Sequence, residues 1–276
     1  MWTTVALMSA LSFTPAQAGQ LELKNARFTY GFLGQARKES TFLPGDLVLL
    51  QFDIEGLKVK DDGYAKYSVG WSLFSHKKNK ELFAKEPETL EVVNSLGGSS
   101  QPVFIMPRPG TYMEPGDYTI KVDVADVLGG TPQKLERKFT VKPMEFGIVN
   151  PGFVYHVNPG VAGPLYAPPV AVPMQNLMLH FTTVGATEQG EKSLPKVSLK
   201  VEIQDESGKP VKKTPITGKA ERYDTDEAKK LKLIPFQIPI QVNRSGKFKI
   251  VVSAKDEHAG KTTSLPPLDL TVIDVK

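Results

Sequence analysis

The chain repeats itself, and this repeat limits the possible folds more than any other feature of the sequence. Four groups of residues recur in the same order, and the two members of each pair lie 125 to 132 residues apart. The pairs are Asn25, Phe28 and Tyr30 with Asn150, Phe153 and Tyr155; Pro44, Phe52 and Gly56 with Pro173, Phe181 and Gly185; Phe104, Met106 and Pro107 with Phe236, Ile238 and Pro239; and Gly116, Tyr118, Ile120, Val122, Asp126 and Gly130 with Gly246, Phe248, Ile250, Val252, Asp256 and Gly260. This series indicates a duplication whose join lies near residues 142–146.

Within each copy the apolar residues alternate with polar ones, which is typical of strands with one buried face. The clearest runs begin at Tyr67, Tyr118, Val197 and Phe248, and turn residues rich in Gly, Pro and Asp separate them. About seven strands are expected in each copy. The predicted fold class is all-β, with a single short helix over residues 224–231 that Asp224 would cap.

The last hairpin of each copy resembles a known type of domain. Residues 115–126 are expected to form one strand of this hairpin and residues 138–141 the strand that runs back beside it; in the second copy the two strands are residues 245–256 and 270–272. In both copies a Gly, an alternating strand, an Asp and a turn precede the final strand. This pattern is similar to the tandem immunoglobulin-like and fibronectin type III-like domains of exported bacterial proteins. The resemblance implies two antiparallel β-sandwich domains, over residues 19–145 and 146–276, and implies no particular function.

The N-terminus predicts export. An apolar stretch precedes Ala16-Gln17-Ala18, so residues 1–18 are interpreted as a signal peptide, although residues 1–4 lack the expected Lys or Arg. No later stretch approaches the roughly 18 apolar residues of a membrane helix. We therefore expect a secreted or periplasmic protein without a membrane span. The chain contains 0 cysteines, which excludes disulfides, thiol nucleophiles and cysteine-based zinc sites.

No catalytic, cofactor or metal motif is present. The 4 histidines have no ligand-like spacing, and the formal charge of +4 includes no basic tract interleaved with aromatic residues, so neither zinc nor nucleic acid is expected. Asp61, Asp62, Asp123 and Asp126 are candidate oxygen ligands for calcium, as are Asp205 and Asp256 in the second copy. The equivalence of Asp126 and Asp256 favours a shared turn role instead.

The two copies differ most in one loop. Residues 34–40 are polar, whereas the corresponding residues 156–170 are apolar and rich in proline. Two interpretations stay open. The favoured one is that the loop packs at the junction between the copies, and the other is a partner-binding loop anchored by Leu165 and Tyr166.

These observations lead to a functional expectation. The chain is expected to be a non-catalytic extracytoplasmic binding or scaffolding protein that acts through protein–protein interaction, with another extracytoplasmic protein or a cell-surface component as partner and no cofactor. The alternative is a carbohydrate-binding module, although Trp71 shares its face with Tyr67 and Leu73 and is expected in the core. A hydrolase with scattered carboxylates and a pilus-type chaperone are less favoured.

Overall fold

The computed structural model describes residues 20–107, 113–155, 165–191 and 193–274. The fold is nearly all β, which confirms the predicted class. We call residues 20–141 the N-terminal half and residues 147–274 the C-terminal half. The strands of the N-terminal half are β1 (Glu22–Phe28), β2 (Thr41–Phe42), β3 (Leu50–Glu55), β4 (Tyr64–Ser75), β5 (Lys80–Val93), β6 (Gln101–Ile105), β7 (Gly116–Asp126) and β8 (Gln133–Val141).

The C-terminal half follows a linker of residues 142–146. Its described elements include one helix, α1 (Asp226–Leu231). Its strands are β9 (Gly147–Tyr155), β10 (Tyr166–Ala167), β11 (Val170–Ala171), β12 (Asn176–Val184), β13 (Glu188–Gln189), β14 (Leu194–Pro195), β15 (Val197–Asp205), β16 (Ile216–Ala220), β17 (Leu233–Gln241), β18 (Gly246–Asp256), β19 (Lys261–Ser264) and β20 (Leu268–Val272).

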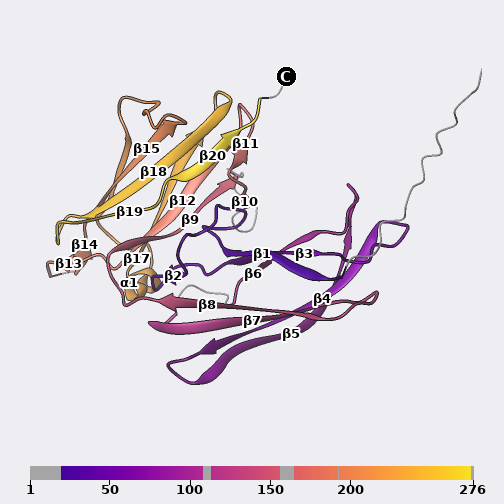
Figure 1. Ribbon diagram of the computed structural model, residues 1–276. Helices are drawn as coiled ribbons and strands as arrows, with labels where there is room; N and C mark the ends of the chain where they lie inside the picture. The colour runs from indigo at the N-terminus through magenta and orange to yellow at the C-terminus, as the bar shows by residue number, and fades with distance from the viewer. Residues whose placement is uncertain (1–19, 108–112, 156–164, 192, 275–276) are drawn as a thin grey trace, which may run out of the picture.

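The two halves have the same sheet topology. In the N-terminal half one sheet has the order β1-β3-β6 and the other the order β2-β8-β7-β4-β5. In the C-terminal half the corresponding orders are β9-β12-β17, extended by β10, and β11-β20-β18-β15-β16. Each half even begins its larger sheet with a short parallel pair, β2 on β8 and β11 on β20. The repeat in the sequence is therefore also a repeat of topology, and Figure 1 shows the two halves side by side.

A left-handed asparagine marks the first long strand of each half. Asn25 in β1 and Asn150 in β9 both have φ of 53°. Each lies at a bulge, where the register to the neighbouring strand shifts. Asn tolerates this conformation better than most residues, which explains why this residue type recurs in both copies.

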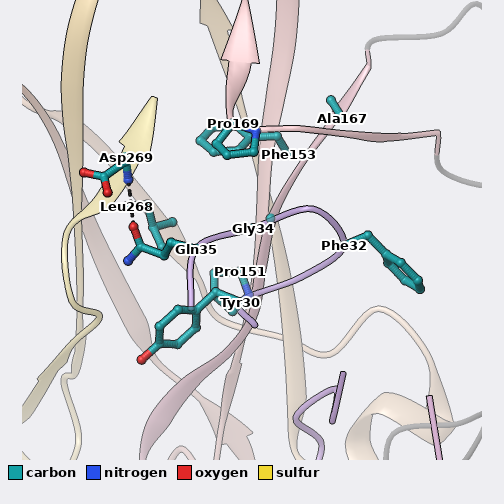
Figure 2. Close-up of a pocket in the computed structure, with 11 residues that line it drawn as sticks. Tyr30, Phe32, Gly34, Gln35, Pro151, Phe153, Ala167, Pro169, Leu268 and Asp269 are labelled. Atoms are coloured by element: carbon teal, nitrogen blue, oxygen red, sulfur yellow. Dashed lines mark hydrogen bonds between the residues drawn. The ribbon is translucent and has the colours of Figure 1, made fainter. Parts of the chain in front are cut away.

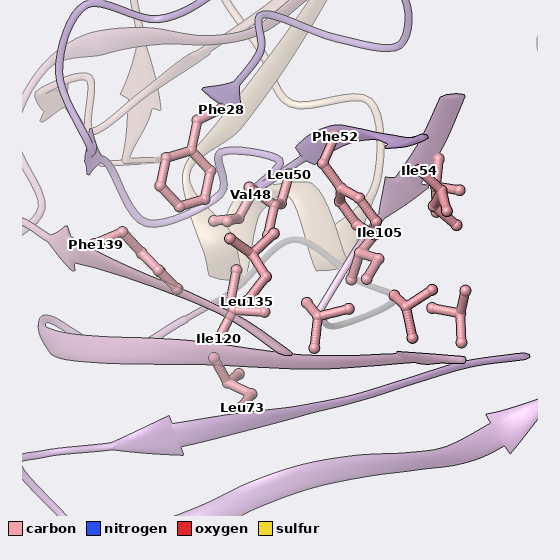
Figure 3. Packing of buried hydrophobic residues seen from close by; sticks show 14 of the residues in the cluster. Phe28, Val48, Leu50, Phe52, Ile54, Leu73, Ile105, Ile120, Leu135 and Phe139 are labelled. Atoms are coloured by element: carbon pink, nitrogen blue, oxygen red, sulfur yellow. The ribbon is translucent and has the colours of Figure 1, made fainter. Parts of the chain in front are cut away.

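Each half buries its own hydrophobic cluster. In the N-terminal half, Leu50, Phe52 and Ile54 of β3 face Leu73 and Ile120 of the larger sheet (Figure 3). In the C-terminal half the cluster is built from the alternate residues of β12, β15, β18 and β20. Burying one such side chain fully contributes about 1.5–3 kcal/mol, so each cluster is large enough to hold its two sheets together.

Two local expectations differ from the structure. Trp71 is only partly buried and stacks on Phe83 of β5, with ring centroids 4.8 Å apart. The smaller sheet has three strands against five in the larger one, so the β5 side of the larger sheet is not covered by it. Helix α1 begins one residue later than expected, because Thr225 caps it and accepts a hydrogen bond from the Ala228 amide at 3.0 Å. No helix in the described part of the chain is long and apolar enough to cross a membrane.

Candidate functional site at the junction of the two halves

A loop of the N-terminal half reaches into the C-terminal half. The loop connects β1 to β2, and backbone hydrogen bonds from Tyr30 to Gln35 and from Arg37 to Phe28 close it at its base. Gly31 has φ of 71°, and a Cβ built on it would lie 2.7 Å from the Pro151 carbonyl oxygen. Only glycine therefore fits where this loop meets β9.

Gln35 joins this loop to the last strand of the chain. Its side-chain amide donates to the Pro267 carbonyl at 2.9 Å and accepts from the Asp269 amide at 3.1 Å. Figure 2 shows the second of these bonds between the loop and the start of β20. The Gln35 side chain thus makes two hydrogen bonds across the junction. It donates to one backbone carbonyl and accepts from one backbone amide, as the backbone of a neighbouring strand would.

A buried ion pair joins the β1–β2 loop to the turn that follows β2. Arg37 donates to Asp46 at 2.7 Å, and the two side chains are only 7% and 4% exposed. The Arg37 guanidinium also stacks on the rings of Tyr30 and Phe42, at 4.3 and 4.5 Å from their centroids. Burial raises the pKa of the Tyr30 hydroxyl, with Arg37 opposing and Asp46 adding to the shift.

Asp46 and Gly45 bind the asparagine bulge of the C-terminal half. The Asp46 carboxylate accepts from the Asn150 backbone amide at 3.1 Å, and the Asn150 side chain donates to the Gly45 carbonyl at 2.8 Å. Gly45 has φ of 92°, and a Cβ there would lie 2.8 Å from the Leu233 side chain. The ion pair and the junction therefore share one carboxylate.

Aromatic rings cover one side of the junction. Phe32 lies between Phe104 of the N-terminal half and Tyr166 of the C-terminal half, with centroids 6.1 and 4.4 Å away. Of the two residues predicted as partner anchors, Tyr166 is therefore engaged with the other half, although it stays 38% exposed. Leu165 is 46% exposed, and its carbonyl accepts from the Tyr155 amide. Residues 156–164 of the predicted loop lie outside the described residues.

His180 lies beside this aromatic group. Its ring is 6.1 Å from that of Tyr166, and it occupies the space left by Gly152, where a Cβ would lie 2.8 Å from the His180 Nε2 atom. The junction segments partly cover this histidine. Burial lowers the pKa of the imidazole, and the Nε2 atom has no hydrogen-bond partner among the described residues.

The cavity enclosed by the junction is small. It has a volume of about 20 Å³, and Tyr30, Phe32, Pro151, Phe153 and Leu268 are among the residues that line it (Figure 2). One water needs roughly 10–15 Å³ of such space, so the cavity holds about one water. Among the described residues the junction is therefore closely packed at this cavity, which has no room for an organic ligand.

Asp126 and Asp256, two of the aspartates considered for calcium, make turn hydrogen bonds. Asp126 accepts from the Lys58 and Leu128 amides at 2.8 and 2.9 Å. Asp256 accepts from Thr187 and His258 in the same manner. Each carboxylate ties the turn after its strand to a neighbouring loop, which is the shared role that their equivalence favoured. Within the described residues, no group of three or more His, Asp or Glu is placed to hold a metal ion.

Comparison with known proteins adds little to this geometry. No protein-family model matches the chain. No curated protein matches it in sequence. Among solved structures, dimeric latent PorU from Porphyromonas gingivalis aligns with 94% of this chain and 20% of its own, at 11% identity and a TM-score of 0.40. The chain thus spans about a fifth of that protein, and a similarity at this level assigns no function.

Proposed function

We propose that the chain is a non-catalytic extracytoplasmic binding or scaffolding protein, built from two immunoglobulin-like β-sandwich domains over residues 19–145 and 146–276 behind a leader of residues 1–18. The strand orders support this division, because each half repeats the same two sheets and buries its own cluster. A module of this kind acts by presenting surfaces to a partner in the envelope or outside the cell.

The observation that carries the proposal is the fixed junction. Asp46 receives Arg37 from its own half and Asn150 from the other, while Gln35 bonds to Pro267 and Asp269. These six residues, in two separate sets of bonds, hold the halves in one orientation. A rigid pair of domains is what a scaffold needs in order to keep two binding surfaces at a constant spacing.

Leu165 is the exposed residue we assign to partner contact. It is adjacent to Tyr166, whose ring packs against Phe32 but stays partly exposed, so the two predicted anchors have different environments. Replacing Leu165 removes apolar surface without touching the junction. Replacing Tyr166 also removes the packing on Phe32.

The test is affinity capture with immobilised full chain and native envelope and culture-fluid extracts. We expect one dominant protein to be retained, and we expect Leu165→Ser to lose it. Leu96→Ser is the matched control, because Leu96 is fully exposed and lies on the other half. Retention by Leu165→Ser would exclude the anchor, and retention of no protein by the unchanged chain would contradict the proposed function.

A carbohydrate-binding role is the second candidate, and the Trp71–Phe83 pair favours it. The two rings are stacked at 4.8 Å, and Phe83 is exposed at the uncovered side of the larger sheet. Exposed aromatic faces are suited to sugar rings. Retention on a polysaccharide column that Phe83→Ala abolishes would support this role, whereas equal retention of the variant would exclude the pair.

A further inference from the structure

The C-terminal half is open at one end of its sandwich. A cavity of about 560 Å³ lies there, within the range of roughly 300–1,000 Å³ that small-molecule sites occupy. Most of the residues that line it have apolar side chains and come from both sheets, while polar atoms contribute more of its accessible surface than apolar atoms do. The residues that form the apolar wall include Ile203, Ile216, Ile240, Val242, Phe248 and Leu270.

The same place in the N-terminal half is filled. Strand register makes Leu73, Tyr118 and Phe139 the equivalents of Ile203, Phe248 and Leu270. All three are buried in the N-terminal half, whereas Ile203 and Phe248 are partly exposed. The two halves therefore differ in side-chain burial at positions that the repeat makes directly comparable.

Missing aromatic rings account for the space. In the N-terminal half Phe139 stacks on Tyr118 at 5.3 Å and meets Phe42 edge-on at 5.5 Å. In the C-terminal half Leu270 stands in place of Phe139 and Ala171 in place of Phe42, since β11 pairs with β20 in the register that β2 has with β8. Cores are close-packed, and of these two positions Leu270 lines the cavity, so the loss of the ring that Phe139 supplies leaves volume that the neighbouring side chains do not fill.

The segment over this end also differs between the halves. In the N-terminal half the Met113 side chain is buried in the core, and the Tyr118 hydroxyl donates to the Glu114 carbonyl at 2.7 Å. In the C-terminal half residues 242–245 connect β17 to β18, and the Arg244 guanidinium lies 5.2 Å from the centroid of the Phe248 ring. A cation thus stands over an apolar wall.

The charges at the mouth are of one sign. Arg244 and Lys212 line the cavity, no carboxylate does, and neither cation forms an ion pair within the described residues. A strand is a poor occupant, because the edge strand β17 lacks an N–H at Pro235 and Pro239. The cavity offers apolar side chains beside two cations that form no ion pair within the described residues.

We propose that this cavity binds a small amphiphile, an alkyl or aryl chain that carries an acidic group, with a medium-chain fatty acid as the simplest example. The chain lies against Ile203, Ile240 and Leu270, and the acid lies at Arg244 and Lys212. This site is distinct from the junction and from Leu165. It goes beyond the proposed function, which stands or fails on protein capture alone.

The first experiment is a titration of the full chain with octanoate, octanol and octyltrimethylammonium, followed through the methyl NMR signals of Ile203, Ile216 and Ile240. We expect saturable shifts with octanoate, weaker binding of octanol and the weakest binding of the cation. The signal of Ile120, buried in the N-terminal half, should not move. Absence of saturable shifts with octanoate, or equal binding of the three probes, would overturn the proposal.

Two pairs of variants locate the site. Lys212→Gln with Arg244→Gln should weaken octanoate binding about tenfold or more, since hydrogen bonds to charged groups are stronger than those between neutral ones. Lys219→Gln with Arg222→Gln, which removes the same charge at a different cleft, should leave affinity unchanged. Equal loss in both double variants would show general charge attraction and overturn the assignment.

Leu270→Phe restores the ring that the N-terminal half has, and it should abolish octanoate binding without loss of folding. Phe139→Leu is the reciprocal change, and it should leave binding in the C-terminal half intact. If Leu270→Phe is folded, as judged by its NMR spectrum, and still binds octanoate as the unchanged chain does, the cavity is not the site.

Discussion

The turn at residues 43–46 and its equivalent at residues 172–175 have the same backbone and opposite surroundings. Both close with a hydrogen bond from the fourth residue to the first carbonyl, at 3.0 and 3.2 Å. The third residue is left-handed in each, Gly45 with φ of 92° and Met174 with φ of 74°. Gly45 is buried against Leu233 of the other half, whereas Met174 is 90% exposed.

This difference shows which features belong to the fold and which belong to the junction. The left-handed turn occurs in both halves, so the sandwich itself requires it. The glycine and the aspartate occur only where the other half packs on the turn, because Asp46 must accept from Asn150 and Gly45 must leave room for Leu233. Equivalent positions therefore separate folding requirements from docking requirements.

The largest expected effect comes from Asp46→Ala. The substitution leaves the Arg37 guanidinium buried without its carboxylate and also removes the acceptor of the Asn150 amide. Breaking such a buried pair costs about 3–5 kcal/mol in the free energy of unfolding. Chemical denaturation measures this loss, with Gln175→Ala at the equivalent position as control. The control should lose about 1 kcal/mol at most. Equal losses would mean that the pair has no special role at the junction.

The second comparison exchanges the left-handed residues. Gly45→Met forces a side chain into Leu233 and a left-handed backbone on a residue with a Cβ, and it should cost about 2–4 kcal/mol. Met174→Gly removes only the strain of a left-handed backbone at a residue with a Cβ, and it should raise the free energy of unfolding by about 0.5–1 kcal/mol. Thermal unfolding of both variants measures the difference. A gain in stability from Gly45→Met would show that the turn is not docked.

The third comparison concerns the filled and the open cores. Phe139→Leu removes a ring that packs on Tyr118 and Phe42, and it should cost about 1–2 kcal/mol. Leu270→Phe adds the ring where space exists, and its free energy of unfolding should stay within about 1 kcal/mol of the unchanged chain. Denaturation midpoints measure both. A large loss from Leu270→Phe would show that the open end cannot accept a ring.

The strands and the duplication could be predicted from the sequence because they depend on local patterns. The alternation beginning at Tyr67 and at Val197 predicted strands that the structure has as β4 and β15. The matched asparagines were recognised as part of the repeat, but the bulges at Asn25 and Asn150 were not predicted. The burial of Trp71 was predicted wrongly, because alternation identifies the face of a strand and not how far the opposite sheet extends. That extent depends on strand pairing over long sequence separations.

The junction could be located but not resolved from the sequence. The contrast between residues 34–40 and 156–170 favoured packing of the longer loop at the junction; residues 156–164 lie outside the described residues, and among residues 165–170 the Tyr166 ring packs on Phe32 of the other half. Nothing local showed that Gln35 bonds to Asp269 or that Arg37 is buried, since both lie in a polar stretch that reads as a solvated loop. The one available signal was the mismatch between Asp46 and Gln175 at equivalent turns. The open cavity likewise required the register that equates Phe139 with Leu270.

The smallest expected effect distinguishes His180 from Gln51, its equivalent in the N-terminal half. Each is paired with a residue of the first long strand, His180 with Gly152 and Gln51 with Arg27. Burial lowers the pKa of His180 below its ordinary value of 6.5, so the unfolded chain binds a proton more readily than the folded one. The free energy of unfolding should therefore decline as pH falls from about 6.5 toward the lowered value, and level off below it. His180→Gln should remove that part of the slope. Urea denaturation at a series of pH values measures both proteins. Identical slopes would mean that the imidazole is solvated in the folded chain and that the junction does not cover it.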